Sequence, residues 1–126
     1  MTRFDPRKGL IVIQTYIKGP TGDTIARLAL DTGASATIIS HDLLELVGYS
    51  PSSLPKTVRF TTGSRVESAP RLVIEQLTAL DRVMKSFAVV AHTLPPTAAI
   101  DGVLGLDFLR ENVLEIDFKR GEIRLF

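Results

Sequence analysis

The residues best suited to chemistry in this sequence follow an apolar segment at residues 28–30. Asp31 comes directly after that segment, and the small residues Thr32, Gly33 and Ala34 follow it. A carboxylate at the end of a strand is open to a substrate on one side, and a glycine lets the backbone turn sharply and leaves its N–H groups accessible. A carboxylate held by such amides can act as a general base, or as a general acid when it is protonated.

The tripeptide at residues 31–33 also has a purely structural interpretation. Asp and Gly are common turn residues. At average composition, Asp followed by Ser or Thr and then Gly occurs by chance in roughly several per cent of chains of this size. The tripeptide alone therefore favours a turn, and the surrounding elements must decide whether it is a catalytic site.

The elements on either side of Asp31 are a predicted hairpin and a predicted helix. Residues 9–18 and 24–30 are rich in β-branched and apolar residues, and they flank a turn cluster at 19–23. Residues 41–47 have an apolar face and early carboxylates, with Ser40 as a helix N-cap and Gly48 at the C′ position. The aspartate is thus expected between a strand and a short connection to a helix of about two turns.

The rest of the chain shows many short strands. Three further hairpins are predicted, at residues 56–72 with its tip near Gly63, at 72–80 with 83–91, and at 113–118 with 122–126. A loop covers residues 93–101, and a short helix is expected at 106–110. This pattern predicts an all-β fold, a closed β-barrel or sandwich with one or two short helices, in a single domain over residues 1–126.

Composition and charge narrow the class of protein. The chain has 126 residues, of which 44% are hydrophobic, so a core can be buried. The net charge is +1 with no basic stripe, which argues against a nucleic-acid partner. There is no Cys, which excludes disulfides and thiolate chemistry, and we expect neither a metal nor a cofactor. No apolar run is long enough for a signal region or a membrane span, so we expect a cytoplasmic protein that does not bind membranes.

In this context the chain resembles the retropepsin-like aspartic protease family, in its cellular and bacterial form. Residues 28–34 resemble the family's apolar strand with its Asp-Thr-Gly-Ala, and residues 37–39 resemble the strand that follows. The hairpin around Gly63 stands where the family places its flap. Residues 101–109, with Gly105 after two apolar residues, resemble the family's last motif and its short helix.

The resemblance assigns roles to individual residues. Asp31 would be the catalytic carboxylate, Thr32 would brace the two active loops across a dimer axis, and Gly33 would let a substrate backbone lie close. The stretch from Val103 to Gly105 would pack beneath the active loop. The positions implied to bind substrate are Ala34, Thr62, Gly63 and Ser64.

The resemblance also implies a homodimer that acts on a peptide or protein substrate. Peptide hydrolysis without metal or covalent intermediate requires one carboxylate as base and one carboxylic acid as donor. The chain contains a single Asp-Thr-Gly and no Asp-Ser-Gly. A two-fold axis between two copies would supply the second carboxylate.

Two positions depart from the viral members of the family. Those enzymes usually have Asp at the position of Ser35 and Arg at the position of Leu106, and the two residues pair. Both are replaced together here, so the network at the dimer interface is expected to differ.

Asp107 is expected to cap or anchor the short helix rather than act as the second carboxylate. His41 and His92 are expected to be ordinary surface or cap residues.

Two alternatives remain open from the sequence. The first is a catalytically silent module of the same fold that binds peptides or serves as a scaffold. It is suggested by the small number of aromatic residues, two Tyr and six Phe without Trp. The second is an unrelated all-β domain in which Asp31 lies in an ordinary turn.

Overall fold

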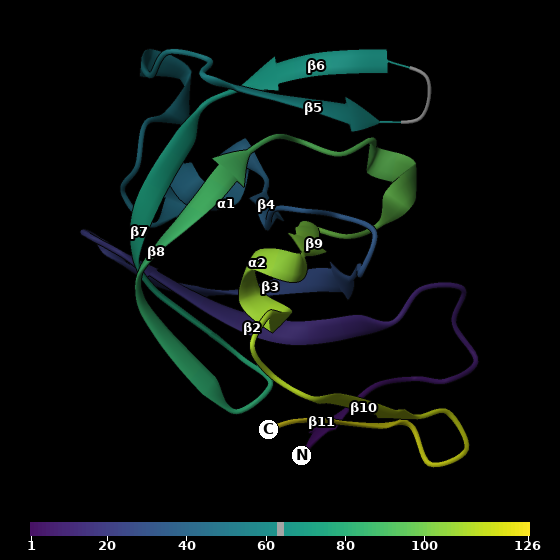
Figure 1. Ribbon diagram of the computed structural model, residues 1–126. Helices are drawn as coiled ribbons and strands as arrows, with labels where there is room; N and C mark the ends of the chain where they lie inside the picture. Colours follow the sequence, from purple (N-terminus) through teal and green to yellow (C-terminus); the bar gives the residue numbers. More distant parts are fainter. Residues whose placement is uncertain (63–64) are drawn as a thin grey trace.

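Six strands close into a β-barrel in the order β2-β3-β9-β4-β8-β7 (Figure 1). The computed structural model describes residues 1–62 and 65–126. Neighbouring barrel strands are antiparallel except for the pairs β3–β9 and β4–β8, which are parallel. The barrel strands are β2 (Val12–Gly19), β3 (Gly22–Leu30), β4 (Ile38–Ile39), β7 (Arg71–Ala79), β8 (Arg82–Ala91) and β9 (Gly102–Leu104).

Two smaller sheets lie at opposite ends of the barrel (Figure 1). One is the hairpin of β5 (Val58–Thr62) and β6 (Arg65–Ala69). The other has the order β1-β11-β10 and is built from β1 (Thr2–Arg3), β10 (Leu114–Asp117) and β11 (Glu122–Leu125). The helices are α1 (His41–Leu46), α2 (Leu106–Leu109) and the single-turn 3-10 segments η1 (Pro51–Ser53) and η2 (Pro96–Ala98). None of the helices in the described part of the chain has the length and apolar character that a membrane crossing requires.

The core fills the barrel because alternate side chains of each strand point inward. In β2, Ile13, Thr15 and Ile17 are buried whereas Gln14 and Tyr16 face outward. The core extends beyond the barrel to α2 and β11. Its largest fully buried apolar side chains are Ile13, Ile17, Leu28, Ile39, Leu44, Ile74, Leu77, Leu104 and Ile123.

Helix α1 begins and ends as its sequence predicts. The Ser40 hydroxyl accepts a hydrogen bond from the Leu43 N–H at 3.4 Å, which caps the N-terminus. Gly48 has φ +104°, a conformation that L side chains rarely adopt, and it directs the chain away from the helix. The capped helix packs Leu44 and Val47 into the core and sets the direction of the segment that leaves Asp31.

The predicted all-β fold, a closed barrel with short helices, is confirmed. The four predicted hairpins correspond to β2–β3, β5–β6, β7–β8 and β10–β11. The first strand begins at Val12 rather than at Gly9. The short strands β1 and β9 were not predicted, since each is defined by pairing with a distant partner rather than by a local pattern.

Candidate active site

Asp31 lies at the end of β3, between two neighbouring segments that hold its backbone. The preceding Leu30 N–H donates to the Ile11 carbonyl at 2.8 Å. The Asp31 N–H donates to the Leu104 carbonyl of β9 at 3.0 Å. The carboxylate therefore starts from a backbone position that is fixed by the barrel, while the loop after it is free to face outward.

The loop itself orients the Asp31 carboxylate. The Gly33 N–H donates to Oδ1 at 2.8 Å, and the Ala34 N–H donates to the Asp31 carbonyl at 3.2 Å. Asp31 is half-buried, whereas Thr32 and Gly33 are exposed. Among the described residues, only Oδ1 of this carboxylate has a hydrogen-bond partner. Oδ2 is thus open to accept a proton from water or from a second carboxyl group.

The segment after β9 lies directly beneath this loop. The Leu106 N–H donates to the Ala34 carbonyl at 2.8 Å. A Cβ atom at Gly105 would lie 2.7 Å from the Ala36 carbonyl and 2.8 Å from the Ala34 carbonyl. Only a glycine lets the two backbones approach this closely. Of the residues predicted to pack beneath the active loop, Gly105 lies against it, and the Leu104 carbonyl accepts the Asp31 N–H.

A hydrogen-bond network centred on the buried Thr37 fixes the far side of the loop. Thr37 is fully buried, and its N–H and hydroxyl donate to Oδ2 and Oδ1 of Asp107 at 2.9 and 2.7 Å. The Thr37 hydroxyl also accepts a hydrogen bond from the Gly105 N–H at 3.2 Å. Asp107 does lie in the first turn of α2, but its carboxylate bonds to the loop rather than to the helix's own amides. Thr37 was not predicted from the sequence as a site residue. Its hydroxyl in an otherwise apolar stretch was the local sign that could have identified it.

Asp101 has a similar connecting role. Its Oδ2 accepts a hydrogen bond from the Arg27 N–H of β3 at 2.8 Å. The Arg27 guanidinium donates to the Ala99 carbonyl at 3.2 Å. These contacts attach the stretch after η2 to β3, four residues before the strand reaches Asp31.

Only some of the predicted substrate-binding positions lie among the described residues. Ala34 is half-buried at the foot of the candidate loop. Thr62 is the last residue of β5, and Gly63 and Ser64 lie outside the described residues. The described strands of that hairpin lie over the end of the barrel reached by β4 and β8 (Figure 1).

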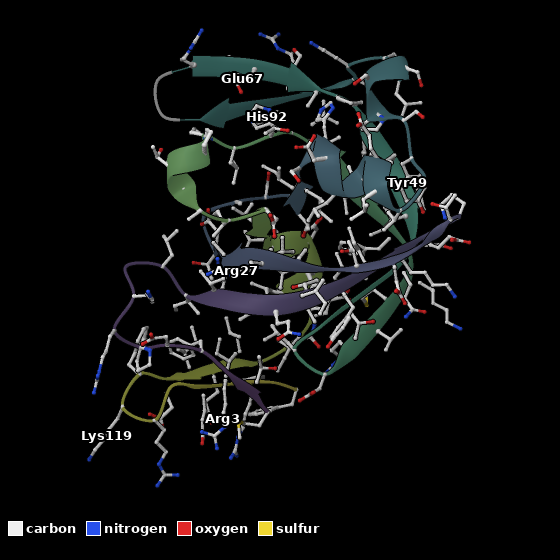
Figure 2. The ribbon with its side chains drawn as sticks, turned by 180° about the vertical axis from the view of Figure 1, so that it is seen from behind. Arg3, Arg27, Tyr49, Glu67, His92 and Lys119 are labelled. Carbon is white, nitrogen blue, oxygen red and sulfur yellow. The ribbon has the colours of Figure 1, made fainter. Side chains whose placement is uncertain are left out.

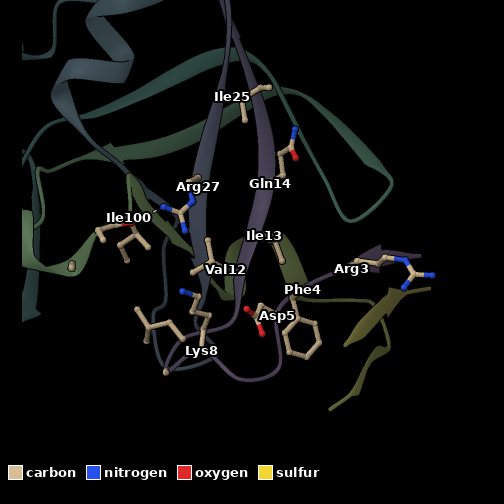
Figure 3. A pocket seen from close by; sticks show the side chains of 14 residues that line it. Arg3, Phe4, Asp5, Lys8, Val12, Ile13, Gln14, Ile25, Arg27 and Ile100 are labelled. Atoms are coloured by element: carbon tan, nitrogen blue, oxygen red, sulfur yellow. Dashed lines mark hydrogen bonds between the residues drawn. The ribbon is translucent and has the colours of Figure 1, made fainter. Parts of the chain in front are cut away.

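A surface groove of about 940 Å³ lies on the outer side of β2 and β3 (Figure 3). Its walls come from the N-terminal segment, from β2 and β3 and from residues 98–100. The charged residues that line it are Arg3, Asp5, Lys8 and Arg27. Asp31 is not among its lining residues, so this groove and the candidate active loop are separate features of the single chain.

A closed barrel that presents a hydrogen-bonded Asp-Thr-Gly loop above a close-packed glycine defines the class of retropepsin-like proteins. The chain belongs to the aspartyl protease family, whose model, described as "Aspartyl protease", matches residues 13–108. No curated protein matches the sequence significantly.

Solved structures show the same fold at low sequence identity. A retropepsin-like aspartic protease from Rickettsia conorii has a TM-score of 0.71 and 15% identity, over 99% of this chain and 87% of that one. The retroviral protease-like domain of Ddi1 from Leishmania major has a TM-score of 0.60 and 17% identity, over 94% of this chain and 90% of that one. The predicted retropepsin-like fold is confirmed.

Proposed function

We propose that the protein is a homodimeric aspartic endopeptidase, in which Asp31 of each copy contributes one carboxylate to a shared site. The observation that carries this proposal is the geometry of the loop. One oxygen of Asp31 is held by the Gly33 amide at 2.8 Å, and the loop around it is exposed on one side. Membership of the aspartyl protease family supports the same class of chemistry.

The reaction follows from two carboxyl groups that share one proton. Two like charges in one site cannot both be ionised easily, so the pair keeps a proton between its members. The ionised carboxylate takes a proton from water, and the water oxygen attacks the peptide carbonyl. The protonated carboxyl gives its proton to the substrate, and proton return to the amine allows the C–N bond to break. Because one carboxyl group must stay protonated, activity should be greatest in acid.

The requirement for a second copy follows from the single Asp-Thr-Gly. A C₂ axis through the exposed loop would bring two Asp31 side chains together and would let the two Thr32 hydroxyls brace one another. The strand β11 pairs with β1 on one side and with β10 on the other over Glu122 and Ile123. That part of the C-terminal strand has no free edge, which supports a dimer centred on the active loops.

The remaining site residues have roles in holding the substrate. Gly33 carries no side chain, so an extended peptide backbone can lie against the loop. Ala34 would contact the peptide next to the loop. The hairpin positions Thr62, Gly63 and Ser64 would contact its opposite side. Extended peptides add main-chain hydrogen bonds to such edges, and the pockets between them select side chains.

The test is cleavage of a mixed peptide library from about pH 3 to about pH 7, with the wild type beside Asp31→Asn. We expect cuts by the wild type, strongest in acid, that are lost in the variant. Equal cleavage by both proteins would rule out Asp31 as the catalytic group. Asp42→Asn, an exposed carboxylate in the first turn of α1, is the matched control and should cleave like the wild type.

The main alternative is a peptide-binding module without turnover. The observation in its favour is that one chain by itself supplies a single Asp-Thr-Gly carboxylate. Saturable binding of library peptides without cleavage, by a protein that stays monomeric at high concentration, would favour this function over the protease.

A further inference from the structure

The β5–β6 hairpin is not part of the barrel's hydrogen-bonded sheet. It forms a two-stranded sheet of its own, and isolated hairpins are at best marginally stable in water. Its base is held where β6 continues into β7, with the Ala91 N–H donating to the Pro70 carbonyl at 2.9 Å, and beyond that point side-chain contacts hold it to the barrel. Among the described residues, one contact stands out because it joins both hairpin strands to a single barrel residue.

That residue is His92, which follows β8. Phe60 and Glu67 are directly opposite each other across the hairpin, so their side chains lie on the same face. The Phe60 ring lies 4.9 Å from the His92 ring, at 74° between the planes. The Glu67 Oε2 lies 3.0 Å from His92 Nε2. Figure 2 shows Glu67 and His92 facing each other between the hairpin and the barrel.

The barrel side of this contact leads to the candidate active site. The His92 N–H donates to the Ile39 carbonyl at 3.1 Å. Ile39 belongs to β4, the strand that follows the Asp31 loop through the buried Thr37. His92 thus connects the hairpin to the strand that leaves the candidate catalytic loop.

The polar part of the contact depends on a proton. Glu67 Oε2 is buried and makes no hydrogen bond within the described part of the chain, so its 3.0 Å contact with His92 Nε2 is a close approach of two chargeable groups. A buried carboxylate oxygen that makes no hydrogen bond is costly, and a positive charge on the adjacent imidazole would offset part of that cost. When both ring nitrogens of His92 are protonated, the contact becomes an ion pair. Histidine is the side chain that ordinarily changes its charge between about pH 5 and about pH 8.

Other charged groups face the same region. Arg65 lies on the same face of the hairpin as Glu67, two residues earlier in β6, and is exposed. His41, at the start of α1, is half-buried, and its N–H donates to the Thr93 hydroxyl at 3.3 Å. Within the described residues, however, the ion-pair contact of Glu67 is to His92 alone.

We propose that His92 is a positioning residue that holds the β5–β6 hairpin on the barrel by a proton-dependent clamp to Glu67. The clamp is strong when the imidazole is charged and the carboxylate is ionised, and it is weaker when the imidazole is neutral. Its consequence for catalysis rests on the proposed protease function: the hairpin would be best held over a substrate in the same acidic range that the carboxyl pair requires.

Hydrogen exchange tests the clamp without any need for activity. The reporters are the β5 amides, whose intrinsic exchange rates are the same in wild type, His92→Phe and Glu67→Gln at any one pH. His92→Phe keeps an aromatic ring against Phe60 but removes the chargeable group. At about pH 5 we expect these amides to exchange about five-fold faster in either variant than in the wild type. At about pH 8, where an imidazole is neutral, the difference should largely disappear.

Two results would overturn the proposal. Equal exchange in wild type and variants at about pH 5 would show that the contact does not hold the hairpin. An equal difference at both pH values would show that packing, not charge, does so. Glu75→Gln, on the exposed side of β7, is the control for loss of a carboxylate outside the cluster and should leave the β5 amides unchanged.

A second readout links the clamp to the site. In a protein that cleaves peptides, His92→Phe should raise KM about five-fold in acid with little change in kcat, because the substitution loosens substrate contacts and leaves Asp31 in place. A fall in kcat alone would count against a positioning role. If Asp31→Asn cleaves as well as the wild type, the proposed function fails, while the exchange result still decides the clamp.

Discussion

The Thr37 hydroxyl donates a hydrogen bond of 2.7 Å to Oδ1 of Asp107, which joins the end of the candidate active loop to the first turn of α2. The same hydroxyl accepts the Gly105 N–H, and the Thr37 N–H donates to the other carboxylate oxygen. Two segments that are distant in sequence, the loop that ends at Thr37 and residues 105–107, thus meet at one buried side chain. Because buried polar groups are costly when unpaired, the loop is expected to depend on this junction for its stability.

The first prediction concerns Thr37→Val, which keeps the shape of the side chain and removes the hydroxyl. The Gly105 N–H then lacks an acceptor and Asp107 Oδ1 lacks a donor, so the free energy of unfolding should fall by about 1–3 kcal/mol. Urea denaturation measures this loss. Thr37→Ser retains the hydroxyl and is the control; if it destabilises as much as Val, the methyl group and not the hydrogen bonds would be responsible.

The second prediction concerns Gly105→Ala. The new Cβ would lie 2.7 Å from backbone atoms of Ala36, which cannot move without shifting the loop. We expect a loss of at least about 2 kcal/mol in the free energy of unfolding. Gly9→Ala is the matched control, since a Cβ there meets no atom within 4 Å. Equal midpoints for both variants in urea would contradict the close approach beneath the loop.

A third prediction follows from Tyr49, whose hydroxyl accepts the Glu75 N–H of β7 at 2.8 Å. Opposite this point Ser86 has φ +51°, and the ladder between β7 and β8 is interrupted there. Tyr49→Phe should speed exchange of the Glu75 amide and cost about 1 kcal/mol of stability. The Tyr16 hydroxyl accepts a hydrogen bond from the exposed Gln14 side chain, so Tyr16→Phe should change neither quantity.

Local patterns in the sequence predicted the barrel's hairpins and α1 because each pattern is set by neighbours along the chain. Ser40 and Gly48 mark the two ends of α1 through their own backbone chemistry. In contrast, β1 and β9 have two and three residues, too few to show a period. They are strands because β11 and β3 lie beside them.

The candidate site also has features that the local sequence predicts and features that it does not. The position of Asp31 at a strand end could be read from the residues around it. The Thr37–Asp107 bond joins residues 70 positions apart; the Thr37 hydroxyl is a local sign of a polar contact, but nothing in either segment indicates its partner. His92 was expected to be an ordinary surface or cap residue, whereas it lies 3.0 Å from Glu67, in the middle of the β5–β6 ladder. Such contacts depend on how strands are brought together, which a single sequence does not encode locally.

The last prediction tests whether two copies build one site. Asp31→Asn should leave the stability of the fold within about 0.5 kcal/mol of the wild type, because the asparagine oxygen can still accept the Gly33 N–H. The variant can therefore exchange into dimers with the wild type. If each site needs Asp31 from both copies, an equal amount of variant added to a fixed amount of wild type leaves about half of the original wild-type dimers.

Peptidase activity should then fall to about half, and further as more variant is added. Activity that stays constant would mean that each chain carries a complete site of its own. The control is an equal amount of Asp31→Asn that also carries Thr32→Arg, a bulky charge on the exposed residue expected at the dimer axis. That double variant should fail to pair and should leave the wild-type activity unchanged. The contrast between the two additions separates subunit exchange from simple competition for substrate.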